Sequence, residues 1–108
     1  MPVHNKLVRD RIPEIIESTG KQYSTKVLNH EEYIKELKSK SREELDEYIN
    51  AENDKDAIEE LADILEIIHA LAECHGASIE TVEAVRQKKA EKRGGFKEKI
   101  YLIEVEDE

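Results

Sequence analysis

The sequence contains very little sulfur, few aromatic rings and no long apolar run. Its 108 residues include one cysteine and one methionine, and aromatic residues make up 5% of the chain. A lone cysteine, Cys74, cannot form an internal disulfide, which excludes a disulfide-stapled fold and is consistent with a reducing cytoplasm. No stretch approaches the length that crosses a bilayer, and the first residues lack the apolar run of a signal peptide. We therefore expect a cytoplasmic protein with no membrane partner.

Basic residues are scarce relative to acidic ones. The chain has 17 Lys and Arg against 26 Asp and Glu, which gives a formal net charge of −9. A nucleic-acid binder needs clustered Lys and Arg, so this balance argues against that class. Charged residues make up 40% of the chain, which is typical of a helical bundle with a thin apolar seam. Because no linker or repeat divides the sequence, residues 1–108 are expected to form a single domain.

Local signals predict four helical segments. The predicted helices span residues 7–18, about 30–51, 55–75 and 79–93. Asn29, Asp54 and Ser78 are the expected N-caps of the last three, because their side-chain oxygens can accept hydrogen bonds from first-turn amides. Residues 21–28 and 99–105 are rich in β-forming side chains and add at most a small β element. The predicted fold is mainly α, a bundle of about four helices.

Two pairs of carboxylates are the most informative feature of the chain. Glu44 and Glu47 lie on the second predicted helix, and Glu60 and Asp63 lie on the third. The i, i+3 spacing places each pair on one helix face, and two antiparallel helices can bring the pairs together. Oxygen-only ligands select a hard cation, Mg²⁺ or Mn²⁺, over zinc. The spacing thus predicts a metal site; the alternative is that these acids simply pair with basic side chains.

Apolar residues flank these acids on the third predicted helix. At about 100° per residue, Ile64, Ile67 and Leu71 fall beside Glu60. A second apolar stripe lies about 120° away and consists of Ile58, Leu61, Leu65 and Ile68. This helix is therefore expected to be buried on two sides. Four helices from so short a chain can hardly cover both, so we expect a homo-oligomer, a dimer or tetramer.

The acidic segments also form a recognisable motif. Glu43 to Glu47 reads EELDE and is followed after a short gap by ELAD at residues 60–63. Together they resemble the EExxE…ExxD signature of MazG-like nucleotide pyrophosphohydrolases, of the all-α NTP pyrophosphatase type. Residues 5–13, NKLVRDRIP, and 88–96, KKAEKRGGF, resemble the phosphoribosyl-ATP-pyrophosphohydrolase-like branch. The likeness covers most of the chain, from about residue 5 to residue 102.

The resemblance implies a reaction and a role for each acid. It makes Glu44, Glu47, Glu60 and Asp63 the Mg²⁺ ligands. Glu43 becomes a supporting catalytic acid that orients water or a second ion, and an acid behind the ligands can take the proton of the attacking water. The implied reaction cleaves a nucleotide, a nucleoside triphosphate or a phosphoribosyl-ATP-like molecule, between its α- and β-phosphates and releases pyrophosphate.

Basic residues near both ends of the chain are candidate phosphate contacts. Lys6, Arg9 and Arg11 form a cluster that is equally consistent with phosphate binding and with ordinary salt bridges. Lys89 and Arg93 lie in the last turns of a helix, where cations also suit the helix dipole. The resemblance makes these two triphosphate contacts. The alternative function is a non-catalytic helical interaction or regulatory module that retains the scaffold.

Overall fold

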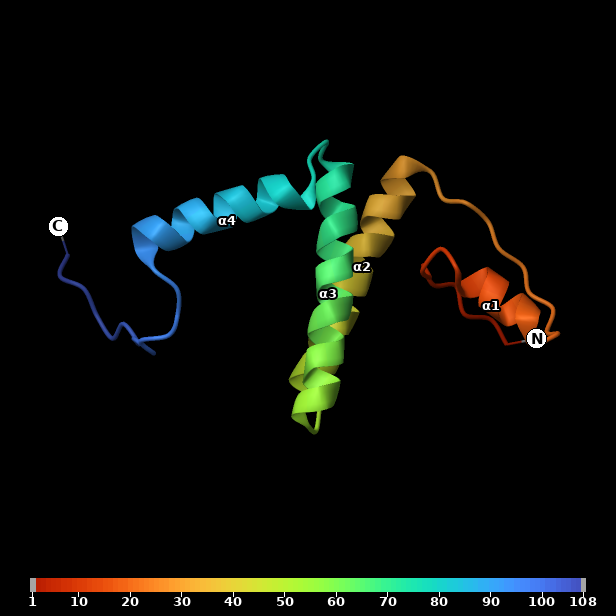
Figure 1. Cartoon of the computed structure of the whole chain (residues 1–108), viewed down its shortest axis with the longest axis horizontal. Coiled ribbons are helices and arrows are strands. Elements are labelled where there is room, and N and C mark those ends of the chain that lie inside the picture. Colours follow the sequence, from red (N-terminus) through yellow and green to blue (C-terminus); the bar gives the residue numbers. More distant parts are fainter. Residues whose placement is uncertain (1, 108) are drawn as a thin grey trace.

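The protein is mainly α-helical, as the sequence predicts (Figure 1). The computed structural model describes residues 2–107. Its helices are α1 (Ile12–Ser18), α2 (His30–Ile49), α3 (Asp54–Cys74) and α4 (Ile79–Arg93). Helices α2 and α3 form an antiparallel hairpin at the centre, while α1 lies on one side of it and α4 extends from the other. The prediction of four helices is confirmed.

Each long helix begins at a capping side chain. Asn29 forms a capping box: its side chain accepts from the Glu32 amide at 2.8 Å, and the Glu32 carboxylate accepts from the Asn29 amide at 3.2 Å. The N-cap of α3 is Asn53, one residue before the predicted Asp54, because the extended Asn53 accepts from the Asp56 amide at 2.8 Å. Ser78 caps α4 as predicted.

Two segments differ from the sequence-based expectation. Helix α1 begins at Ile12 instead of residue 7, because Pro13 occupies its first turn and disfavours helix in the residues before it. Residues 21–28 and 99–105 form no strand, and residues 2–107 as a whole contain none. The two segments lie on opposite sides of the α2–α3 hairpin (Figure 1), too far apart to pair within one chain.

The core lies between α2 and α3. Leu37 from α2, together with Ile67 and Ala72 from α3, is buried there. Glu44 is buried in the same seam, with 8% of its surface exposed. The carboxylate of Glu44 therefore lies within the apolar contact between α2 and α3, and the candidate site is the region around it. None of the helices described here is long and apolar enough to cross a membrane.

Candidate metal centre

Three of the predicted acids converge across the hairpin. Glu44 and Glu47 from α2 and Glu60 from α3 each offer a carboxylate oxygen, and these oxygens lie within 4.8 Å of one another. The i, i+3 spacing puts the first two on one face of α2, and the antiparallel packing of α3 brings Glu60 to that face. The structure thus assembles most of the predicted ligand set.

The depth of the three carboxylates differs. Glu44 is buried, Glu60 is half-buried and Glu47 is exposed, so the cluster runs from the helix seam to the surface. Glu44 Oε2 and Glu60 Oε2 are buried and find no hydrogen-bond donor within residues 2–107. Because buried polar atoms are normally paired, these two oxygens call for a proton or a cation as a partner.

The pKa of Glu44 reflects this crowding. Burial is the largest cause; the hydrogen bonds that protonated Glu44 can share with Glu60 and Glu47 add to it, as do the charges of Glu47 and Asp63, and together they raise its pKa from 4.5 to about 7. The hydrogen bond with Glu44 lowers the pKa of Glu60, but burial and the neighbouring Glu47 and Asp63 outweigh it, so the net shift is upward. The cluster therefore holds a proton near neutral pH unless a cation replaces it.

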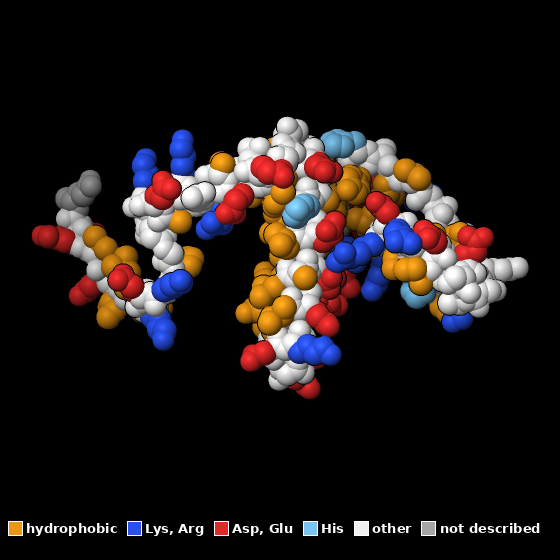
Figure 2. Space-filling model, viewed as in Figure 1, with side chains coloured by type: hydrophobic (Ala, Val, Ile, Leu, Met, Phe, Trp, Pro, Cys, Tyr) orange, Lys and Arg blue, Asp and Glu red, His pale blue; other side chains and the backbone are white. Residues whose placement is uncertain are grey.

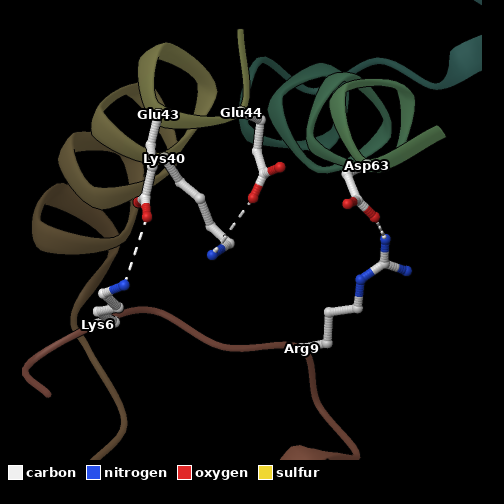
Figure 3. Close-up of polar contacts among 6 residues, drawn as sticks. All are labelled: Lys6, Arg9, Lys40, Glu43, Glu44 and Asp63. Atoms are coloured by element: carbon white, nitrogen blue, oxygen red, sulfur yellow. Dashed lines mark hydrogen bonds and ion pairs between the residues drawn. The ribbon is translucent and has the colours of Figure 1, made fainter. Parts of the chain in front are cut away.

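Asp63, the fourth predicted ligand, lies beside the cluster and is engaged elsewhere. Its Oδ1 accepts a hydrogen bond from Arg9 Nη2 at 2.6 Å (Figure 3). Arg9 belongs to the N-terminal segment, which passes beside α2 and α3 in this view, with Arg9 pointing toward Asp63. Arg9 engages one of the two Asp63 oxygens, so a cation that used Asp63 as a ligand would bind Oδ2 or compete with Arg9 for Oδ1.

Two lysines approach the neighbouring acids. Lys6 Nζ lies 3.4 Å from Glu43 Oε1, and Lys40 Nζ lies 4.0 Å from Glu44 Oε1 (Figure 3). Glu43 is exposed at the rim of the cluster and is not one of the three convergent acids. Glu43 thus pairs with Lys6 outside the three convergent acids, and the catalytic role that the resemblance implies for it stays a prediction.

The remaining predicted phosphate contacts are not gathered at the centre within one chain. Arg11 pairs with Glu14 at 3.0 Å inside the α1 region. Lys89 and Arg93 lie on α4, which leaves the end of the hairpin and runs away from it (Figure 1). Of the five basic residues, the structure thus brings Lys6 and Arg9 to the acids and leaves the other three apart.

Sequence reasoning missed the partners of the N-terminal basic residues. Lys6 is separated from Glu43 by 37 positions and Arg9 from Asp63 by 54. No local periodicity connects residues so far apart. Only their charge could have indicated these partners, because an exposed basic segment is attracted to a cluster of crowded carboxylates.

Comparison with known proteins adds no family to this picture. No family model, no curated protein and no solved structure matches the chain. What the centre can do is therefore inferred from its own chemistry: three convergent carboxylates, two buried oxygens without donors, and two basic side chains at the rim.

Proposed function

We propose that the protein is a Mg²⁺-dependent nucleotide pyrophosphohydrolase, with Mn²⁺ as an alternative cation. The substrate class is a nucleoside triphosphate or a phosphoribosyl-ATP-like nucleotide, cleaved between its α- and β-phosphates in the cytoplasm. The observation that carries the proposal is the convergence of Glu44, Glu47 and Glu60, two of which present buried oxygens without donors.

The ligand set fits a hard divalent cation. One carboxylate oxygen each from Glu44, Glu47 and Glu60 lies within 4.8 Å of the others, and no nitrogen or sulfur ligand is among them. Asp63 can complete the set through Oδ2, or through Oδ1 once Arg9 leaves it. A bound Mg²⁺ would supply neutralisation of phosphate charge and a lowered pKa for a coordinated water.

The side chains around the cluster would bind the phosphates and accept the proton of the attacking water. Lys6 and Arg9 lie at its rim, where they can hold the phosphate oxygens of a nucleotide. Glu43 can accept the proton of a water whose oxygen attacks one of the two phosphorus atoms of the α–β bridge. The bond between that phosphorus and the bridging oxygen then breaks, and the products are pyrophosphate and a nucleoside monophosphate. The buried seam holds Glu44 in place during these steps.

A pyrophosphate-release screen tests the proposal directly. The purified protein is incubated with nucleoside triphosphates and with phosphoribosyl-ATP, with Mg²⁺ and with a chelator. We expect release of pyrophosphate and a monophosphate product in the presence of Mg²⁺ and no release in the presence of the chelator. If no nucleotide is cleaved while Mg²⁺ binds at the carboxylates, the site is a non-catalytic cation site.

Cation affinity should depend on pH through Glu44. Because its pKa is about 7, a cation must displace a proton from this carboxyl at lower pH. Titration calorimetry should show Mg²⁺ affinity rising about tenfold per pH unit between roughly pH 5.5 and 7, then levelling. Glu44→Gln, which cannot ionise, should lose this dependence. A constant affinity across the window would contradict the shared-proton description.

Arg9 should compete with the cation for Asp63. In Arg9→Gln the carboxylate is free and a nearby positive charge is gone, so Mg²⁺ affinity should rise. The pair is exposed, so the gain should be only about three- to fivefold. Arg86→Gln is the matched control, because Arg86 pairs with Glu83 at 2.6 Å on α4. An unchanged or weaker affinity in the Arg9 variant would show that the pair does not oppose cation binding.

A further inference from the structure

The N-terminal segment contacts acids on both hairpin helices. Lys6 Nζ lies 3.4 Å from Glu43 Oε1 on α2. Arg9 Nη2 lies 2.6 Å from Asp63 Oδ1 on α3. Figure 2 shows Lys and Arg side chains gathered where this segment meets the acidic side of the hairpin. Residues 5–11, here named the strap, thus connect α2 to α3 through two ion pairs (Figure 3).

The strap is attached by these side chains and by little else. It contains no helix or strand, and no backbone hydrogen bond joins it to α2 or α3 within the described chain. A hollow of about 100 Å³ lies between it and α2, and Leu7 is its one half-buried residue. Behind it, no Cα atom of α1 lies within 8 Å of a Cα atom of another described helix. The strap can therefore leave the hairpin without opening the core.

The two ion pairs are weak enough to be reversible. All four side chains are 41–56% exposed, and exposed pairs contribute little to stability because water and salt screen them. What holds the strap is the accumulated negative charge of the neighbouring carboxylates. A change in that charge should therefore change how often the strap is docked.

A divalent cation at the centre would weaken this attraction. Mg²⁺ would cancel two negative charges of the cluster and repel the basic groups of Lys6 and Arg9. By thermodynamic linkage the effect is reciprocal, so a docked strap weakens Mg²⁺ binding by the same factor. Lys40 differs from the strap residues, because it belongs to α2 and stays four residues from Glu44 in either case.

We propose that the strap is a cation-controlled latch. It docks on the acids through Lys6 and Arg9 in the cation-free protein, is released when Mg²⁺ binds, and docks again on the phosphate groups of a bound polyphosphate. Phosphate oxygens then replace the carboxylates as partners in charge-assisted hydrogen bonds. The latch gives an order of binding, cation before polyphosphate, because only the cation frees the two basic groups. The inference rests on the proposed cation centre and not on the cleavage reaction.

Limited trypsin digestion of the full chain measures whether the strap is docked. Trypsin cuts after Lys6 when the strap is free, so the rate of this cut follows the population of the released state. The cut after Lys99, an exposed residue beyond α4, is the internal reference for protease activity. Relative to that reference, the cut after Lys6 should be slow in chelator at low salt. Saturating Mg²⁺ should speed it about three- to tenfold, as expected for the loss of two exposed ion pairs. Inorganic tripolyphosphate with excess Mg²⁺ should slow it again.

Two further conditions test whether charge holds the strap. In chelator, raising NaCl from about 0.01 M to 1 M shortens the Debye length from about 30 Å to 3 Å and should speed the cut after Lys6 without any divalent cation. Glu43→Gln, which removes the partner of Lys6, should speed it about two- to fivefold in chelator at low salt. Glu83→Gln is the matched control and should leave it unchanged, because Glu83 pairs with Arg86 on α4.

Calorimetry of Mg²⁺ binding in the same buffers separates the possible failures. If Mg²⁺ binds while the cut after Lys6 keeps its chelator rate, the latch is wrong and the cation centre stands. If Mg²⁺ does not bind, the cation centre and the latch both fail. A cut that stays fast in tripolyphosphate would overturn the return of the strap to phosphate. A cut that salt does not speed would show that the strap is held by packing and not by charge.

Discussion

Replacing Glu60 by glutamine should reduce pyrophosphate release about a thousand-fold or more. Glu60 is the member of the three convergent carboxylates that comes from α3, so its loss leaves only Asp63, which pairs with Arg9, as a candidate ligand on that helix. The amide preserves size but removes the negative charge that attracts Mg²⁺, and with it several kcal/mol of charge stabilisation during phosphate cleavage. A continuous pyrophosphate assay at saturating nucleotide measures the loss, and calorimetry should show weakened Mg²⁺ binding in parallel.

Glu59 provides the matched control on the same helix. It is the preceding residue, it is exposed, and it is not among the convergent acids. Glu59→Gln should keep full activity and Mg²⁺ affinity, although it removes the same charge from the same turn. Equal losses in the two variants would mean that general acidity, and not a defined ligand set, supports the reaction. Full activity of the Glu60 variant would remove this residue from the centre.

The helices were predictable because their signals are local. Asn29 and Ser78 cap the helices that they were expected to cap, since a side-chain oxygen next to free amides acts within four residues. The shift from Asp54 to Asn53 has the same cause, because both residues can cap and the sequence alone does not decide between neighbours. The missing pairing of residues 21–28 with 99–105 depends on where the chain ends lie, which local signals do not encode.

The centre was predictable to the extent that helical spacing defines it. The i, i+3 pairs and the short break between helices are sufficient to bring Glu44, Glu47 and Glu60 together. The hydrogen bond of Asp63 to Arg9 depends on the path of an irregular segment and not on any periodicity. The second apolar stripe of α3, made of Ile58, Leu61, Leu65 and Ile68, was expected to be buried but is 37–65% exposed. The apolar pattern predicts burial without saying what covers the stripe.

Replacing Glu44 by glutamine should make the cation-free protein more stable at pH 8. The pKa of Glu44 is about 7 in the folded protein against an ordinary 4.5, so the folded form retains a proton that the unfolded form releases. Stability from this group is therefore complete below about pH 4.5 and is lost as the pH rises to about 7. The neutral amide avoids that loss. After allowance for screening by solvent, we expect about 1–2 kcal/mol in the free energy of unfolding, or about 5–10 °C in Tm.

Thermal melts in chelator at pH 4.5 and at pH 8 separate this result from a structural salt bridge. The Glu44 variant and the wild type should melt together at pH 4.5, where the wild-type carboxyl is protonated, and diverge at pH 8. Adding Mg²⁺ at pH 8 should raise the Tm of the wild type more than that of the variant, because the variant lacks the buried carboxylate of the proposed ligand set. The 4.0 Å contact with Lys40 gives the opposite expectation. If that ion pair dominated, Glu44→Gln would melt lower at pH 8 in chelator, and Glu44 would be an acid that holds α2 together, not a cation ligand.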